Sequence, residues 1–554
     1  MPVVTDDYRD KRFLIVDDFE SFQLILKRLL HNLNAKNIDT AVNAQKALAL
    51  CEEHQYDVIF CDFDLGKGQN GLQLLEELRH KKLLASGTIF IIVTADASRD
   101  AVVGSLEYKP DAYMNKPISA AELKARLLKS LKQKSELDNI NRFIDSKRYA
   151  EAIVLCDKEI NANSKQKNWC LKTKGQLLIE LKKWDEAEKL YREVNDKRPL
   201  FWANLGLANV LAATQKYEDA LAFYQQAFQE NSASLEAYEG AAKMLIKLGD
   251  PQEAQKILEQ ISHISSRSVS RQKLLAEVSK MNGDFDTAAK ASRKVVRLAE
   301  NSIHKSAENE LDLADNLTEA ALHSSDKKKI KAYAKEALGT LHQTHRENAD
   351  QDIKIQSKLI ESRAYVSIKD EKSSRVALEA AEKRLSETGG AKTLRTQLEL
   401  VRSYLQTNNK SKANTLLSEL AEQYKDNPSI CEKLDSILDE PVSKIGKKDV
   451  VKINRDGIKM FDEGQYIEAS QCFLKATQKF PRHIGIRLNI IQSLIFQMKK
   501  SGITAEIIQQ CHQHLSIVKN ITKDHPQYKR YTSIYKTIQT LSKNVTLKES
   551  SDEG

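Results

Sequence analysis

The sequence predicts a multidomain protein in which a doubly wound α/β domain with a five-stranded parallel sheet precedes an all-α superhelical solenoid. Over residues 1–130, short apolar runs alternate with stretches of helical periodicity, which is typical of a parallel sheet covered by helices. After residue 130 the strand signals stop and a repeat of about 34 residues begins, which indicates stacked pairs of helices. At 554 residues, the chain is also too long for one hydrophobic core.

The alternation in the first 130 residues locates each element. The expected strands are the apolar runs at residues 13–16, 40–42, 58–60, 89–93 and 112–114. The expected helices cover residues 20–33, 44–54, 71–84, 99–106 and a segment from 119 onward. In a sheet of this kind the ligand site lies at the carboxyl ends of the strands, where the strand order reverses.

Acidic and polar residues follow or end four of these strands. Asp17 and Asp18 follow the first strand, Asp62 the third and Lys116 the fifth, and Thr94 ends the fourth. Because the carboxyl ends of parallel strands meet at one edge of the sheet, these five side chains should converge. Carboxylates crowded into one pocket repel one another and require a hard divalent cation, and oxygen ligands suit Mg²⁺.

This pattern resembles the receiver domain of bacterial response regulators, which has a flavodoxin-like fold, over residues 10–130. The segments LIVDDFE, VIFCDFD, IIVTAD and YMNKP carry the resemblance. It implies that Asp62 is the phosphoacceptor, that Asp17 and Asp18 are the acidic pair, and that Thr94 is the site hydroxyl. It also implies that Lys116 is the site lysine, with a cis bond to the following proline, and that the remaining position, Tyr113, is the switch aromatic.

The resemblance also implies how these groups act. Asp62 would attack a phosphohistidine and become an aspartyl phosphate. Asp18, Asp62 and the backbone carbonyl of Asp64 would bind Mg²⁺, and Asp17 would act through a metal-bound water.

Two further groups would bind the phosphoryl oxygens. Lys116 would pair with one oxygen and the hydroxyl of Thr94 with another. The inward movement of Thr94 would leave space for Tyr113, and we expect this coupled pair to be the switch.

The loop after Asp62 departs from the usual pattern of the family. It reads FDLGKGQNG, lacks the common proline, is one residue longer, and places the additional carboxylate of Asp64 at the rim of the pocket. The lifetime of the phosphoryl group is therefore not predicted. The alternative is that the pocket is a relic that holds the fold by charge pairing.

An aromatic residue or proline, two intervening residues and an alanine recur after residue 138. The alanines lie 35, 33, 34 and 34 residues apart, at Ala152, Ala187, Ala220, Ala254 and Ala288. Small residues precede the last four alanines by twelve positions, at Gly175, Ala208, Ala242 and Ala276. The anchors resemble the tetratricopeptide repeat, and Gly457, Tyr466, Ala469, Phe473, Ala476 and Pro481 restore the same spacing later in the chain.

These patterns suggest a division of the chain. We expect the α/β domain at 1–130, tetratricopeptide repeats at 131–300 and degenerate helical repeats at 301–438, with one degenerate copy marked by Val401, Tyr404, Ala413 and Leu417. A linker at 439–451, a repeat with further helices at 452–546 and a disordered tail at 547–554 follow. The helix from Ser119 meets neither proline nor glycine before Gly175, so we expect a stiff connection to the first repeat.

Charge and composition exclude several classes of function. The net charge of +9 includes no long basic block, so we expect no binding to nucleic acid. The longest apolar run, residues 89–93, is too short to span a bilayer, so we expect a cytoplasmic protein that does not insert into membranes. The seven cysteines stand singly and should be reduced and packed. The pairs Cys511/His514 and His342/His345 lack a second ligand pair, so surface or packed helix residues are favoured over a metal site.

The sequence after residue 130 contains no helix-turn-helix, nucleotide-binding loop or catalytic motif, so we expect the output to be protein binding. The resulting hypothesis is a two-component response regulator, phosphorylated on Asp62 by a sensor histidine kinase or a phosphotransfer protein, whose repeats bind a protein or peptide. It would not be an enzyme beyond Mg²⁺-dependent self-phosphorylation and self-dephosphorylation. The alternatives are a phosphorylation-insensitive scaffold or phosphate sink whose receiver is a docking domain, and a hidden DNA-binding fold in 301–435. Oligomeric state is left open.

Overall fold

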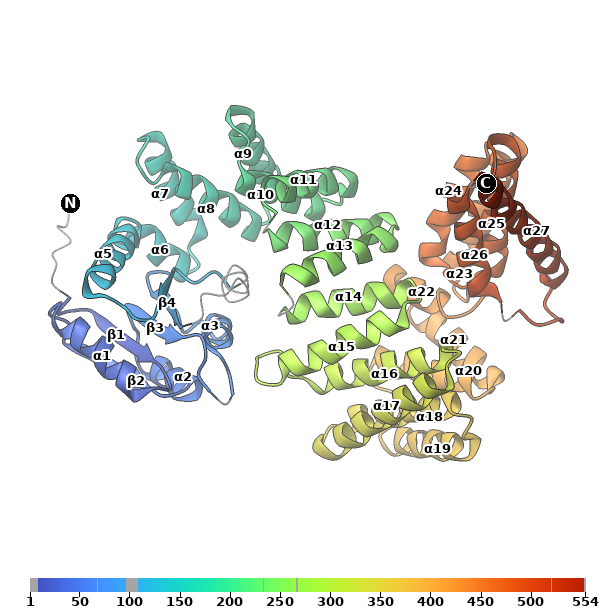
Figure 1. Ribbon diagram of the computed structural model, residues 1–554, viewed down its shortest axis with the longest axis horizontal. Helices are drawn as coiled ribbons and strands as arrows, with labels where there is room; N and C mark the ends of the chain where they lie inside the picture. The colour runs from blue at the N-terminus through green and yellow to red at the C-terminus, as the bar shows by residue number, and fades with distance from the viewer. Residues whose placement is uncertain are drawn as a thin grey trace. The chain divides into compact units, whose positions relative to one another are not determined.

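The computed structural model describes residues 8–552 apart from residues 67, 96–107, 233, 266–267 and 520 (Figure 1). It separates into two compact units, Met1–Thr340 and Leu341–Gly554. The helix expected at residues 99–106 lies outside the described residues.

The first unit opens with the predicted five-stranded parallel sheet. Its strands are β1 (Arg12–Val16), β2 (Asn37–Ala41), β3 (Val58–Asp62), β4 (Ile89–Thr94) and β5 (Ala112–Asn115), in the order β2-β1-β3-β4-β5. The helices that accompany it are α1 (Glu20–His31), α2 (Ala44–Glu53), α3 (Gly71–His80) and α5 (Ala120–Glu136). The α/β prediction is therefore confirmed. β2 begins three residues earlier than expected because it is an edge strand, in which Asn37 and Asp39 weaken the apolar signal.

Alternate residues of β1 belong to two separate cores, one on each face of the sheet. Phe13 and Ile15 pack with the buried leucines of α1 and α5, and Leu14 and Val16 pack with buried alanines of α2 and buried leucines of α3. Strands β3 and β4 are buried along their whole length, which explains their continuous apolar runs.

Helix pairs follow the α/β domain in the first unit. They are α6 (Asp138–Asp145), α7 (Tyr149–Asn161), α8 (Lys167–Glu180), α9 (Trp184–Lys197), α10 (Phe201–Ala213), α11 (Tyr217–Glu230), α12 (Leu235–Leu248), α13 (Pro251–Ile264), α14 (Val269–Met281), α15 (Phe285–Ala299) and α16 (Ala307–His323). The expected stiff helix between the α/β domain and the repeats is wrong: α5 ends at Glu136 and α6 begins at Asp138. Leu137 between them is buried and leaves the helical conformation.

Small residues make space for aromatic rings within the repeats. A Cβ atom added at Gly175 would lie 2.5 Å from the ring of Tyr191, and one added at Gly206 would lie 2.4 Å from it, so this ring contacts the backbone of both helices. The five anchor alanines are all fully buried, at Ala152, Ala187, Ala220, Ala254 and Ala288. The register that the alanines predict therefore matches the packing.

In each of these hairpins, the residue two positions before the helix with the anchor alanine has the left-handed backbone conformation. These residues are Lys147, Lys182, Gln215, Gly249 and Gly283, with φ between 56° and 85°. The same turn recurs before α19 (Glu371–Glu387), α21 (Lys410–Gln423) and α24 (Tyr466–Lys479), at Lys369, Asn408 and Gly464. The hairpin geometry of the repeats thus continues where the sequence anchors fade.

The helix α17 (Lys327–Glu347) ends the first unit and begins the second. The second unit continues with α18 (Gln351–Ser367), α19, α20 (Leu394–Gln406), α21, α22 (Pro428–Asp435), α23 (Lys444–Asp462), α24, α25 (Ile484–Ser501), α26 (Ala505–Val518) and α27 (Tyr528–Asp552). Val401, Tyr404, Ala413 and Leu417 pack in one cluster of α20 and α21, as expected for a degenerate repeat.

Two expected irregular segments contain helix. The linker expected at 439–451 is wrong over most of its length, because α23 begins at Lys444. The carboxylate of Asp435 accepts hydrogen bonds from the amides of Val442 and Ser443 and from the Ser443 hydroxyl, and Ser443 caps α23. The helix α27 continues through residues 547–552 of the expected disordered tail, where the sequence has neither glycine nor proline before Gly554.

Among the described residues, no helix combines the length and the apolar character needed to cross a bilayer.

The buried position of Ala220 predicts the effect of a large side chain there. Ala220→Trp should overpack the contact between α11 and its neighbours and lower the stability of the repeats by about 1 to 3 kcal/mol. Ala222→Trp, on the exposed side of the same helix, is the matched control. Thermal unfolding with hydrogen exchange of α10, α11 and α12 measures both, and equal midpoints would contradict the register.

Candidate functional site

The carboxyl edge of the sheet brings together the residues predicted to form the site. Asp17 directly follows β1, Asp62 ends β3, Thr94 ends β4, and Lys116 follows β5. Asp17, Asp62 and Thr94 are almost fully buried, with 1%, 7% and 7% of their surface exposed. The amide of Lys116 donates to the carbonyl of Thr94 at 2.8 Å, so the last two strands remain paired up to the site.

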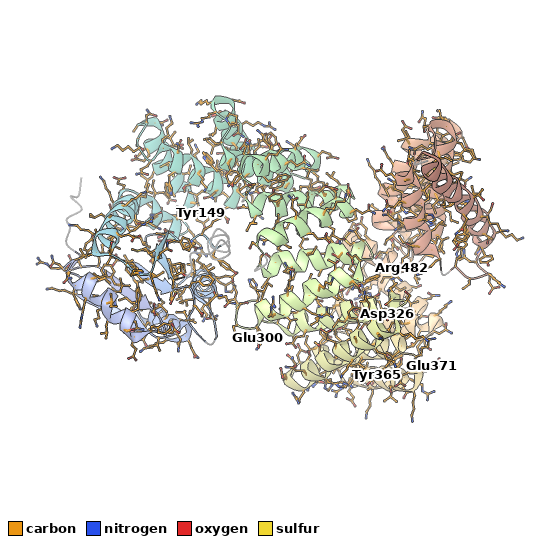
Figure 2. All side chains as sticks on the ribbon, in the orientation of Figure 1. Tyr149, Glu300, Asp326, Tyr365, Glu371 and Arg482 are labelled. Atoms are coloured by element: carbon orange, nitrogen blue, oxygen red, sulfur yellow. The ribbon has the colours of Figure 1, made fainter. Side chains whose placement is uncertain are left out.

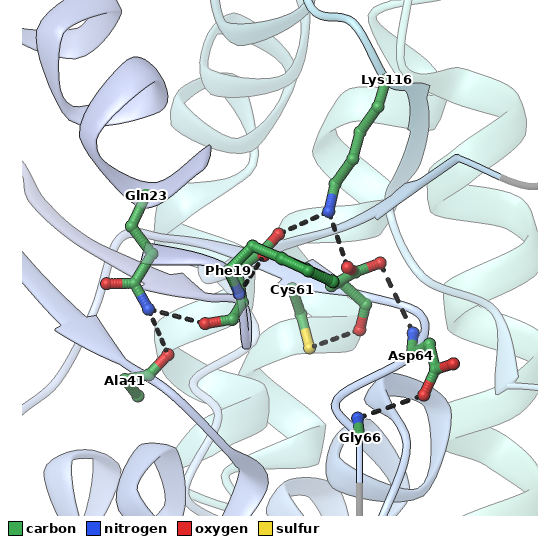
Figure 3. Close-up of polar contacts among 9 residues, drawn as sticks. Phe19, Gln23, Ala41, Cys61, Asp64, Gly66 and Lys116 are labelled. Carbon is green, nitrogen blue, oxygen red and sulfur yellow. Dashed lines mark hydrogen bonds and ion pairs between the residues drawn. The ribbon is translucent and has the colours of Figure 1, made fainter. Parts of the chain in front are cut away.

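Lys116 bridges two of the carboxylates (Figure 3). Its Nζ donates to Oδ2 of Asp17 and to Oδ2 of Asp62, each at 2.6 Å. The ammonium also lies 4.2 Å from the centroid of the Phe22 ring on α1, which is a cation–π contact. One cation therefore neutralises part of the charge of two acids.

The third carboxylate belongs to Asp18, which is more exposed than the other two. One carboxylate oxygen from each of Asp17, Asp18 and Asp62 lies within 4.8 Å of the others. Within the described parts of the chain, this is the group of three or more acidic, histidine or cysteine side chains that is close enough to hold one metal ion. The oxygen donors suit a hard cation with retained water, so the residues fit Mg²⁺.

Burial and charge shift the proton affinities of this site. Burial raises the pKa of Asp62 above its ordinary value, the charge of Asp17 adds to the shift, and the hydrogen bond from Lys116 opposes it. Burial alone would lower the pKa of Lys116, but its hydrogen bonds to Asp17 and Asp62 outweigh burial and raise it. The site therefore keeps Lys116 cationic, but this one positive charge is too little for its three carboxylates.

The loop after β3 closes over the phosphoacceptor candidate. The amide of Asp64 donates to Oδ1 of Asp62 at 3.4 Å, and the carboxylate of Asp64 accepts from the amide of Gly66 at 3.1 Å (Figure 3). Gly66 has a φ of 72° and approaches Asp18, which explains why this longer loop contains glycine. The role of the Asp64 carbonyl as a metal ligand stays a prediction.

The first turn of α3 abuts the backbone of Asp62. A Cβ atom added at Gly71 would lie 2.1 Å from the carbonyl oxygen of Asp62, so only glycine fits there. Asn70 and Gln73 form a reciprocal capping box at this helix start. The position of α3 is thus directly coupled to that of Asp62.

The sequence reasoning did not identify the role of Gln23. Its side chain is 7% exposed and donates to the carbonyls of Asp17 at 2.6 Å and Ala41 at 3.1 Å, which fixes the backbone at the end of β1 (Figure 3). A buried glutamine on an amphipathic helix beside the site was the available signal.

The expected switch residues are also in position. Tyr113 of β5 is half-buried and packs against the core that contains Cys61. The peptide bond between Lys116 and Pro117 is cis, as expected. The coupled movement of Thr94 and Tyr113 stays a prediction.

The other candidate ligands divide between surface and packed positions: His342 is 59% exposed, and its Nε2 lies 3.4 Å from Glu361. The Nδ1 atom of His514 lies 2.8 Å from the guanidinium of Arg487, and burial together with this cation lowers the pKa of His514 to about 4. All seven cysteines are free thiols and six of them are buried, as expected.

Comparisons with known proteins agree with this geometry. The family model of the response regulator receiver domain matches residues 13–128, and a family model of the tetratricopeptide repeat matches residues 211–278. The chain is 30% identical over 119 residues to the chemotaxis protein CheY-3 of Vibrio cholerae, which covers 22% of this chain and 90% of that protein. It is also 30% identical over 118 residues to the chemotaxis protein CheY of Pseudomonas aeruginosa, and this match covers 21% of this chain and 94% of that protein.

Among solved structures, a CheY-like receiver domain protein from Methanospirillum hungatei is 28% identical. The match covers 23% of this chain and 97% of that chain, with a TM-score of 0.21. The chain therefore belongs to the response regulators, as a receiver domain followed by tetratricopeptide repeats.

Proposed function

We propose that this response regulator is phosphorylated on Asp62 by a sensor histidine kinase or a phosphotransfer protein and acts through protein contacts of its repeats. The observation that supports the proposal most strongly is the position of Asp62. It is the buried carboxylate at the end of a central strand, within reach of Asp17, Asp18 and Lys116.

The residues of the pocket have distinct roles in this transfer. Among the described residues, Oδ1 of Asp62 has a single long contact, to the Asp64 amide, so it is the oxygen that would form the bond to phosphorus, while the phosphorus–nitrogen bond of the phosphohistidine breaks and the imidazole leaves. Lys116 would donate to a phosphoryl oxygen and keep its bond to Asp17. Asp18, Asp62 and the backbone carbonyl of Asp64 would hold Mg²⁺, with Asp17 acting through a metal-bound water, and the ion would supply positive charge opposite the transferred group.

The output is the binding of a protein or peptide in the groove of the repeats. Tetratricopeptide repeats stack into superhelices whose concave face takes extended peptides or helices. A receiver of this family and a repeat array both suit a cytoplasmic signalling protein, which is the location we propose.

We predict Mg²⁺-dependent phosphorylation of Asp62. Incubation with a small acyl phosphate or a phosphohistidine donor, followed by mass mapping, should place the label on Asp62. Asp62→Asn should abolish the label, and Asp64→Asn, the matched control at the rim, should retain it. Undiminished label in Asp62→Asn would overturn the assignment.

Removal of the bridging cation should destabilise the receiver. Lys116→Met leaves the buried carboxylates of Asp17 and Asp62 without their shared donor, which should cost about 1 to 3 kcal/mol. Added Mg²⁺ should recover more stability in this variant than in the wild type, because it replaces the lost charge. Hydrogen exchange of β1 and β3 measures the effect, and Lys129→Met, on the exposed face of α5, is the control.

The raised pKa of Asp62 predicts how stability depends on pH. Because the folded state raises this pKa, the contribution of protonated Asp62 is fully present below the unfolded pKa and is lost as pH rises through the folded pKa. Stabilisation by Mg²⁺ should therefore be small in acid and grow as Asp62 ionises. Thermal midpoints of the receiver transition across pH, with and without Mg²⁺, check this, and an equal Mg²⁺ effect at every pH would contradict it.

A further inference from the structure

Helix α3 of the receiver contacts the repeats within the first unit at the turn that follows α15, where Glu300 is labelled in Figure 2. Nε2 of His304, in the turn between α15 and α16, lies 2.9 Å from Oε1 of Glu76 on α3. The Nε2 of Gln73, on the same helix, donates to the carbonyl of Leu298 on α15 at 3.4 Å. We call this set of contacts, between residues 73–76 and residues 298–304, the α3 clasp.

The segment before β5 strengthens the same surface. Arg79 of α3 donates to the carbonyls of Tyr108 and Lys109, which ties this segment to the helix. The ammonium of Lys109 lies 3.2 Å from the carboxylate of Glu236 on α12. Three points along the receiver therefore meet repeat helices that are more than 120 residues away in sequence.

The clasp is a contact that can open without unfolding either the receiver or the repeats. It encloses a cavity of about 40 Å³ lined by Leu72, Gln73 and Glu76 of the receiver and by Val269, Leu298 and Ser302 of the repeats. Its direct bonds are polar, and the side chains of Glu76 and His304 remain 25% and 36% exposed. A polar contact with an imperfectly filled centre costs much less to open than a hydrophobic core.

The receiver also contacts the other end of the first-unit repeats. The carboxylate of Asp145, the last residue of α6, accepts hydrogen bonds from the amide and the hydroxyl of Ser86. Lys134 of α5 donates to the carbonyl of Ser86, which supports this attachment. The receiver thus connects α6 to the turn after α15, so opening the clasp frees the array at one end only.

The clasp is linked to the phosphoacceptor by a short rigid path. Gly71 abuts the carbonyl of Asp62, and its amide donates to the carbonyl of Phe63 at 3.0 Å. Gln73, in this first turn, contacts both the helix cap and the repeats. The Gln73 side chain accepts from the amide of Asn70 in the capping box and donates to Leu298 in the clasp.

We propose that α3 is the surface by which the receiver holds its own repeat array, and that phosphorylation of Asp62 opens this clasp. The inference rests on the proposed function, because it names how that phosphorylation reaches the repeats. A phosphoryl group on Oδ1 of Asp62 displaces the amide of Asp64, so the backbone at Phe63 and Asp64 must move, and with it the capped first turn of α3, whose Gly71 is bonded to Phe63. The array is then released at residues 298–304 and presents this surface to a partner.

The test measures hydrogen exchange of residues 298–306 in the full chain, with beryllofluoride and Mg²⁺ as the phosphoryl mimic. In the wild type, the mimic should increase exchange there at least about fivefold, the lower end of typical coupling between sites. Glu76→Gln should increase exchange without the mimic. Glu53→Gln, an exposed carboxylate at the end of α2, should behave as the wild type.

A charge exchange separates a lost contact from a local fold defect. His304→Glu should open the clasp by repulsion from Glu76, and the addition of Glu76→Lys should restore protection. Unchanged exchange at 298–306 in both His304→Glu and Glu76→Gln would overturn the clasp.

The outcomes also separate this inference from the proposed function. If beryllofluoride raises the thermal midpoint of the receiver but leaves exchange at 298–306 unchanged, phosphorylation works and the opening of the clasp is wrong. If beryllofluoride alters neither the midpoint nor exchange at residues 62–70, the proposed function fails, and phosphorylation-driven opening fails with it. The clasp as a static contact is then still decided by the variants at Glu76 and His304.

Discussion

Lys116 bridges two carboxylates that the topology of the sheet forces into one pocket. Parallel strands end at a common edge, so Asp17 and Asp62 meet there whether or not their charges favour it. A single ammonium cannot neutralise three acids, and the pKa of Asp62 is raised by burial, with a further contribution from the charge of Asp17, despite the hydrogen bond from Lys116. The need for additional positive charge would make the pocket respond to Mg²⁺ and to a phosphoryl group with its counterion, and the proposed signalling depends on this response.

The glycine-rich loop after Asp62 connects this electrostatic site to the rest of the first unit. Gly71 allows α3 to start directly on the backbone of Asp62, where any side chain would clash. The helix therefore follows the loop closely. Because Gln73 belongs to the capping box and also contacts Leu298, a change at the phosphoacceptor needs to travel only one helical turn to reach the repeats. This route differs from a stiff connecting helix, which the break at Leu137 excludes.

The repeats add a second physical constraint, the close approach of paired helices. Tyr191 contacts the backbone at both Gly175 and Gly206, so its ring fixes the spacing of three successive helices. Such contacts join only neighbouring helices, so an array can flex along its length while each pair stays intact. An array of this kind can respond to a contact at one end, such as the α3 clasp, without losing its fold.

The sequence by itself determined the fold class, the strand ends that meet at the site and the register of the repeats, because each follows from local periodicity. Asp17, Asp62, Thr94 and Lys116 were predicted from the ends of apolar runs alone. Only the tertiary structure decided the features that depend on partners far along the chain. Gln23 supports the site through carbonyls of two strands, Asp435 holds the start of α23, and His304 meets Glu76 across 228 residues. A polar side chain has many equivalent partners until packing selects one, so sequence periodicity carries no record of these contacts.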